Sequence, residues 1–138
     1  MEDFVTFETA KKLKEKGFPQ RPDYFNYSSY YDWDGLRKIH SLSNASVWFD
    51  PNISRDNIYF APTISQVLEW LREEKKIHFE FVAAAYGYNV IISQTPEAGG
   101  TDYYFTHMND DGPNDGGAWD RYEDAALYCI EYVLDNLI

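Results

Sequence analysis

The chain has 138 residues, of which 44% are hydrophobic and 25% charged, and this composition is typical of one globular domain, 1–138. Its formal net charge is −11 at pH 7, which argues against direct nucleic-acid binding because a strongly acidic surface repels phosphates. No apolar run approaches the roughly 18 residues of a membrane span, so no membrane association is expected. The single cysteine and the lack of a signal-peptide pattern predict a cytoplasmic protein.

The first predicted element is a helix that begins after Thr6, a good N-cap residue, and ends before Gly17. Val5 and Ala10 are placed to form a hydrophobic staple across its N-terminus. Lysines crowd its C-terminal half, where the helix dipole favours cations. We interpret them as a solvated helix end.

Residues 20–60 are rich in aromatic side chains and favour short strands or ordered loops. Strands are expected at 24–31 and 36–40, joined by a turn at 32–35. Further short apolar runs occur at 47–49 and 58–60. These aromatic side chains either fill the core or line a ligand pocket, and the sequence leaves both readings open.

The segment from Thr63 to His107 predicts a helix followed by a three-stranded meander. Thr63 and Gln66 form a capping box, and Ile64, Val67, Leu68 and Leu71 then recur at helical spacing beside Trp70. Alternation of apolar and polar residues predicts strands at 77–83, 88–94 and 102–107. A polar loop, 108–119, follows.

The last helix is expected to begin at Asp120, with Glu123 completing a second capping box. Its predicted buried face comprises Tyr122, Ala125, Ala126, Cys129, Val133 and Leu137. The whole pattern predicts an α+β fold: an antiparallel sheet, made of the meander and the short aromatic-rich strands, with about three helices packed mainly on one face.

Three segments together resemble a group of small uncharacterised proteins of gut anaerobes and their phages or prophages. The first segment contains Ala61-Pro62-Thr63, Trp70-Leu71-Arg72-Glu73 and Ile77-His78. The second is the opening helix, from Thr6–Ala10 to its end at Lys16-Gly17-Phe18. The third is Tyr122–Ala126, in the last helix. The resemblance covers about half of the chain and implies a phage-associated setting. It implies no activity and assigns no catalytic residue.

The charge is unevenly distributed. Residues 97–138 carry ten acids and one base, Arg121, so nearly all of the net charge lies in this segment. An acidic arc on the last helix is the candidate surface for a basic protein partner, in one version by imitating DNA. Its residues are Asp120, Asp124, Glu131 and Asp135. Leu127 and Leu134 are expected beside this arc, where they cover a strand edge or meet another subunit.

Two sets of residues are candidate metal ligands. His78 and Glu80 share one face of a strand, and His107 would complete a site with two histidines and one carboxylate if its strand lay nearby. Asp110, Asp111 and Asp115 could hold a hard cation within the polar loop, although the EF-hand spacing is absent. Polar strand residues and a flexible, solvated loop are the competing explanations.

No nucleophile elbow, phosphate loop or dinucleotide fingerprint occurs, so an enzyme is less expected than a binding protein, and no cofactor is expected. The leading hypothesis is a non-enzymatic interaction module with an acidic C-terminal surface. The alternatives are a small-ligand or metal-binding protein, with or without catalysis, and a structural subunit of a larger assembly or homo-oligomer.

Overall fold

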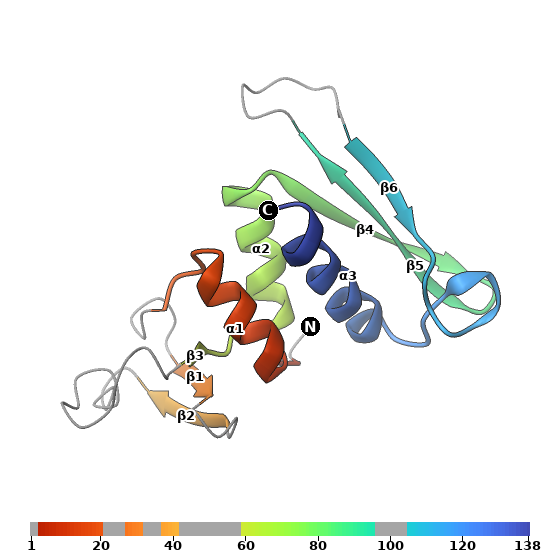
Figure 1. Cartoon of the computed structure of the whole chain (residues 1–138). Helices are drawn as coiled ribbons and strands as arrows, with labels where there is room; N and C mark the ends of the chain where they lie inside the picture. The colour runs from red at the N-terminus through yellow and green to blue at the C-terminus, as the bar shows by residue number, and fades with distance from the viewer. Residues whose placement is uncertain (1–2, 21–26, 32–36, 42–58, 96–104) are drawn as a thin grey trace. The chain divides into compact units, whose positions relative to one another are not determined.

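The residues described by a computed structural model are 3–20, 27–31, 37–41, 59–95 and 105–138 (Figure 1). They form three α-helices and two antiparallel sheets, which confirms the predicted α+β class. The prediction of one sheet is wrong, because the aromatic-rich strands that the structure describes pair among themselves and not with the meander. The chain separates into two compact units: the first unit is 4–63, and the second unit combines 1–3 with 64–138. Within the described residues, no helix is both long and apolar enough to cross a membrane.

Helix α1 (Phe7–Glu15) of the first unit begins and ends where the sequence predicts. The Thr6 hydroxyl accepts a hydrogen bond of 3.2 Å from the backbone N–H three residues along, as an N-cap does. Val5 and Ala10, the two positions of the predicted staple, are fully buried. The helix ends before Gly17, whose φ is +91°.

The sheet of the first unit has the order β2-β1-β3. Strand β1 (Tyr27–Tyr31) pairs antiparallel with β2 (Arg37–Ser41) and with the two-residue β3 (Tyr59–Phe60). These strands lie in three of the runs in which strands were predicted. The apolar run at 47–49 and the turn at 32–35 lie outside the described residues.

Aromatic rings join α1 to this sheet. The Phe7 ring lies 5.6 Å from that of Tyr31 and 5.7 Å from that of Tyr59, centroid to centroid. The Tyr31 hydroxyl donates a 2.6 Å hydrogen bond to the carbonyl of Val5. In the described part of this unit, large aromatic side chains therefore contribute to the small core, and the polar tip of Tyr31 is bonded to a backbone group.

The second unit begins with helix α2 (Ile64–Glu74). Its buried residues are Ile64, Val67, Trp70 and Leu71. The prediction placed Leu68 in this stripe and Trp70 beside it, but Leu68 is only half-buried and Trp70 is 5% exposed. At 100° per residue the buried sector is centred near Val67, which leaves Leu68 at its rim.

Strands β4 (Ile77–Ala84), β5 (Gly87–Gln94) and β6 (Phe105–Asn109) form the predicted meander in the order β4-β5-β6. A two-residue turn joins β4 to β5. Strand β6 runs two residues beyond the predicted end at 107, so Met108 and Asn109 belong to the sheet and not to the loop. They pair with Ile91 and Val90 of β5, and this long-range pairing leaves no local signature.

The two faces of this sheet differ in burial. Ile77, Val90 and Ile92 are buried and occupy one register set, hence one face. Helix α2 contacts β4, and helix α3 (Tyr122–Asn136) contacts both β5 and α2 (Figure 1). On the other register set Glu80 is exposed and Ile91 is half-buried.

Helix α3 differs from its prediction at both its start and its buried face. It begins at Tyr122, and no side chain caps it, so Asp120 is not its N-cap. Leu134, expected beside the acidic arc, is 1% exposed, whereas Tyr122, expected in the core, is 43% exposed. Because α3 packs against α2 as well as β5, its buried face is turned toward Leu134 and also includes Ile130.

Candidate functional site

The acidic loop, defined here as residues 110–120, connects β6 to α3 and has a fixed backbone structure. Gly112 donates its N–H to the carbonyl of Gly117 over 2.7 Å, and Asn114 donates to that of Ala118 over 3.0 Å. A one-turn 3₁₀ helix, Asp115–Gly117, lies between these bonds. The loop therefore forms hydrogen bonds across its own width.

Gly117 makes this fold of the loop possible. Its φ is +72°, a conformation that residues with a Cβ rarely adopt. A Cβ atom built there would also collide with the backbone carbonyl of Asp110. The neighbouring Gly116 has a similar φ of +74°, but open space surrounds its Cβ position. Of the two, only Gly117 marks a place where two backbone segments touch.

Three residues of the β4–β5 hairpin hold the acidic loop against it. The Asn89 side-chain amide donates to the carbonyl of Gly117 over 3.2 Å. Tyr88 and Trp119 exchange two backbone hydrogen bonds, of 2.8 and 2.9 Å. The Asn114 amide donates both to the carbonyl of Tyr86 over 2.7 Å and to the Asp120 carboxylate over 2.6 Å. Asp120 thus orients a loop side chain instead of capping the helix.

Tyr128 of α3 ties the loop to the helix. Its hydroxyl donates a 3.1 Å hydrogen bond to the Asp111 carboxylate, and its ring centroid lies 5.3 Å from that of Trp119. The bond to Asp111 raises the pKa of Tyr128, because ionising the phenol would remove the donated proton. At the other end, the backbone N–H of Asp111 donates to Asn109 Oδ1 over 3.1 Å. No local pattern predicts these contacts, since they join residues from separate elements.

Two polar side chains are enclosed beneath the loop. Asn109 is fully buried, and within the described residues its Nδ2 has no hydrogen-bond partner. Cys129 is also fully buried, and burial, followed by the charge of Asp111, raises the pKa of its thiol to about 12. Cys129 is therefore a core residue, as predicted, and not a nucleophile at neutral pH.

The carboxylates of the loop are exposed and largely without a cation. Arg121, the only base after residue 96, forms ion pairs with Asp3 over 2.9 Å and with Glu123 over 3.4 Å. Asp110, Asp111, Asp115, Asp120 and Asp124 are all exposed, and within the described part of the chain none of them forms an ion pair. These five carboxylates give this part of the surface a large excess of negative charge.

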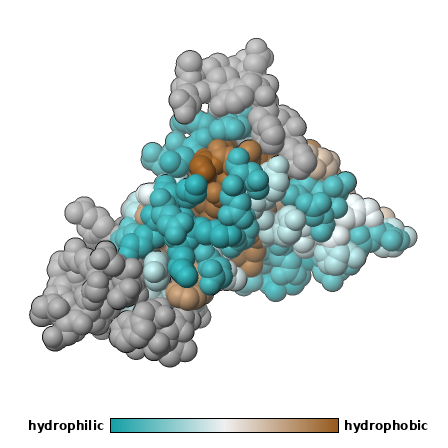
Figure 2. Space-filling model, viewed as in Figure 1, coloured by the Kyte–Doolittle hydropathy of each residue, from teal (hydrophilic) through white to brown (hydrophobic). Residues whose placement is uncertain are grey.

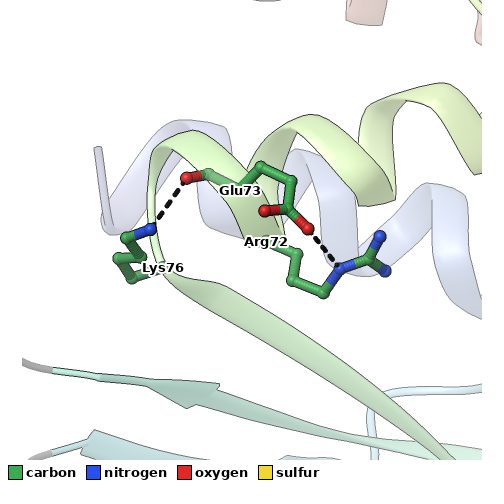
Figure 3. A network of polar contacts seen from close by, with 3 residues as sticks. All are labelled: Arg72, Glu73 and Lys76. Carbon is green, nitrogen blue, oxygen red and sulfur yellow. Dashed lines mark hydrogen bonds and ion pairs between the residues drawn. The ribbon is translucent and has the colours of Figure 1, made fainter. Parts of the chain in front are cut away.

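The C-terminal end of α2 shows the opposite arrangement. The Arg72 Nε donates to a Glu73 carboxylate oxygen over 3.2 Å, and the Lys76 Nζ donates to the Glu73 carbonyl over 3.0 Å (Figure 3). Acids and bases are mixed here, and Arg72 forms an ion pair with Glu73. The end of α2 thus carries charges of both signs, whereas the loop carries acids alone.

The predicted partner-binding residues of α3 are only partly at the surface. Asp124 and Asp135 are exposed and Glu131 is half-buried, and all three lie along one line of the helix. Leu127 is half-buried, and the burial of Leu134 removes it from any surface. Asp110, Asp111 and Asp115, which were predicted only as cation ligands, are exposed in the segment that leads into this helix, as is Asp120, which was predicted to bind a partner.

The predicted metal ligands form no complete site within the described residues. No group of three His, Cys, Asp or Glu side chains there has the arrangement that a metal ion needs. Strand β5 lies between β4, which carries His78 and Glu80, and β6, which carries His107. His78 pairs with Ser93 of β5, whereas His107 pairs with the neighbouring Ile92. The His107 side chain itself lies outside the described residues.

The candidate ligand pocket of residues 20–60 rests on four aromatic residues. Tyr30 is buried, with 5% of its surface exposed, as expected for a core residue. The other three, Tyr24, Trp33 and Trp48, lie outside the described residues.

Comparison of the chain with protein-family models, with curated protein sequences and with solved structures found no match.

Proposed function

We propose that the chain is a non-enzymatic interaction module that binds a basic protein surface through the acidic loop and the exposed acids of α3. The observation that carries this proposal is the set of exposed carboxylates on the loop and the first turn of α3, which have no cation within the described residues. Like charges held close together repel one another, and a cationic partner relieves that repulsion.

The hydrogen bonds of the loop support the same proposal. Asp120 is held by Asn114 and Asp111 by Tyr128, so these carboxylates keep their positions before any partner arrives. Pre-organised side chains lose less conformational entropy on binding than mobile ones do. Complementary charge at such a surface also raises the association rate and selects against acidic partners.

The resemblance to phage-associated proteins supplies a setting for this proposal. An accessory protein of a phage or mobile element that captures a basic host protein, in one version by imitating DNA, fits the charge of this surface. Such a module requires neither a cofactor nor a catalytic residue.

The test compares two double variants with the same change in net charge. Asp115→Asn with Asp124→Asn removes two exposed acids from the proposed surface, and Glu69→Gln with Glu74→Gln removes two exposed acids from α2. Partners captured from a bacterial lysate are identified, purified and titrated against each protein at several salt concentrations.

The Asp115 and Asp124 variant should lose about two- to fivefold in affinity for each charge removed, as expected for exposed ion pairs of ~0.5–1 kcal/mol. Its affinity should also depend less on salt than that of the wild type. The α2 variant should bind like the wild type. Equal binding by all three proteins, with equal salt dependence, would contradict the proposal.

A further inference from the structure

Exposed large hydrophobic side chains gather around the acidic loop. Among the described residues, four such side chains are strongly exposed: Tyr86 at 61%, Met108 at 45%, and Tyr122 and Tyr128 at 43% each. Tyr86 lies in the β4–β5 turn bonded to Asn114, and Tyr128 bonds to Asp111. Met108 pairs with Ile91 and so lies on the opposite face of the sheet from Tyr88, whereas the three tyrosines adjoin the acidic loop or the start of α3. Exposed tyrosines indicate a contact surface, because Tyr is enriched in such surfaces.

Two of these rings are held by other rings. Tyr122 stacks on Tyr88 with a centroid distance of 4.3 Å and an interplanar angle of 22°, and it meets the Phe81 ring edge-on at 5.2 Å. Tyr128 packs against Trp119, as described above. Fixed rings offer a binding area at little cost in conformational entropy.

Carboxylates lie next to these rings. The Asp111 carboxylate bonds to the hydroxyl of Tyr128, and the Asp120 carboxylate shares the Asn114 amide with the carbonyl of Tyr86. Figure 2 shows the end of the second unit that carries the β4–β5 turn and the acidic loop as mainly hydrophilic to neutral on its visible side. A partner for this surface must therefore suit both aromatic faces and negative charge.

Elsewhere among the described residues, rings that are less exposed than these tyrosines, the half-buried Phe7 and the buried Trp70, carry a cation from the chain itself. Lys11 lies over the Phe7 ring, with Nζ 5.1 Å from the centroid, and Lys75 lies over the Trp70 ring at 5.3 Å. Within the described residues, no lysine or arginine lies over Tyr86, Tyr122 or Tyr128. The rings beside the most acidic part of the chain thus lack the cation that other rings have.

We infer that this tyrosine–aspartate surface, made of Tyr86, Tyr122, Tyr128, Asp111 and Asp120, binds an extended, arginine-bearing segment of a protein partner. Both cations can lie over an aromatic face, but only the planar guanidinium group stacks flat on the ring and donates two parallel hydrogen bonds to one carboxylate. The inference rests on the proposed function and narrows it, because the acids alone would accept lysine and arginine equally.

The test uses two fluorescently labelled eight-residue peptides, one alternating arginine with serine and one alternating lysine with serine. Binding of the full chain is measured by fluorescence anisotropy at low salt. The variants are Tyr86→Ser, whose ring is mostly in water, and Tyr86→Ser combined with Tyr122→Leu. Circular dichroism verifies that each variant is folded, and Glu69→Gln with Glu74→Gln serves as the charge control.

The arginine peptide should bind the wild type at least about fivefold more tightly than the lysine peptide. Each ring removed should weaken arginine binding by about two- to fivefold, which corresponds to a cation–π contact at an exposed site. Lysine binding should change less, and the charge control should leave both affinities unchanged.

The outcomes separate this inference from the proposed function. The arginine inference is overturned if the wild type binds both peptides equally and the tyrosine variants bind like the wild type. If Asp115→Asn with Asp124→Asn then abolishes this binding, the proposed acidic interaction surface is still supported. If neither peptide binds at low salt, both are overturned.

Discussion

Two adjacent glycines provide a direct test of the structure of the acidic loop. Gly116 and Gly117 have nearly the same positive φ, +74° and +72°, so alanine at either position meets the same backbone penalty of about 1–2 kcal/mol. They differ only in their surroundings. A Cβ at Gly116 enters open space, whereas one at Gly117 meets the backbone of Asp110.

The extra cost at Gly117 follows from the bonds that its displacement disturbs. Gly117 donates to the carbonyl of Asn114 over 2.9 Å and accepts from Gly112 over 2.7 Å. At about 1 kcal/mol for each hydrogen bond, losing both adds ~2 kcal/mol to the backbone penalty. We expect Gly116→Ala to lower the free energy of unfolding by about 1–2 kcal/mol and Gly117→Ala by about 3–4 kcal/mol.

Two measurements check this expectation. Urea unfolding followed by tryptophan fluorescence gives the free energy of unfolding, and hydrogen exchange gives the local protection of the loop amides. The amides of Gly112, Asn114 and Gly117 should exchange faster in Gly117→Ala than in Gly116→Ala. Losses within about 0.5 kcal/mol of each other, with equal loop protection, would refute the reasoning about the close approach.

Three further predictions concern single side chains of the second unit. Lys76 has a φ of +58°, a conformation that glycine adopts without strain, so Lys76→Gly should raise the free energy of urea unfolding by about 0.5–1 kcal/mol. A lower free energy of unfolding would contradict this and would mean that the bond of Lys76 to the Glu73 carbonyl outweighs the strain. The pKa of Cys129 is raised, so the contribution of its thiol to stability is complete below the ordinary thiol pKa. Between that pH and about pH 12 the free energy of unfolding should fall by about 1.4 kcal/mol per pH unit, because only the unfolded chain loses the proton. Cys129→Ala should remove this fall from the free energy of unfolding measured against pH. Asp111→Asn should lower the pKa of Tyr128 toward its ordinary value, as followed by ¹³Cζ NMR titration, and an unchanged pKa would contradict the hydrogen bond between them.

The elements with strong local signals could be predicted from the sequence. Thr6 caps α1 as expected, because an N-cap bond joins residues only three apart. The alternation from Ile77 onward predicted β4, since a half-buried strand repeats every two residues. The concentration of acids after residue 96 is likewise a property of the sequence alone.

Predictions about α3 and the acidic loop failed where distant residues decide the outcome. Asp120 matches a helix cap by its spacing, but Asn114 binds its carboxylate. Leu134 lies next to acidic positions on a helical wheel, yet contacts of α3 with both α2 and β5 widen the face that is buried. Neither the bonding of Asp120 nor the burial of Leu134 is determined by residues within one turn of the helix.

By itself, the sequence determined the α+β class, the main helices and strands, and the excess of negative charge near its end, because each follows from residue type and short-range spacing. Only the tertiary structure decided that hydrogen bonds join the acidic loop to the β4–β5 turn at Tyr86 and to α3 at Tyr128. Their bonds join residues 17 and 28 positions apart, and such pairings depend on how the strands and α3 pack, not on any local pattern.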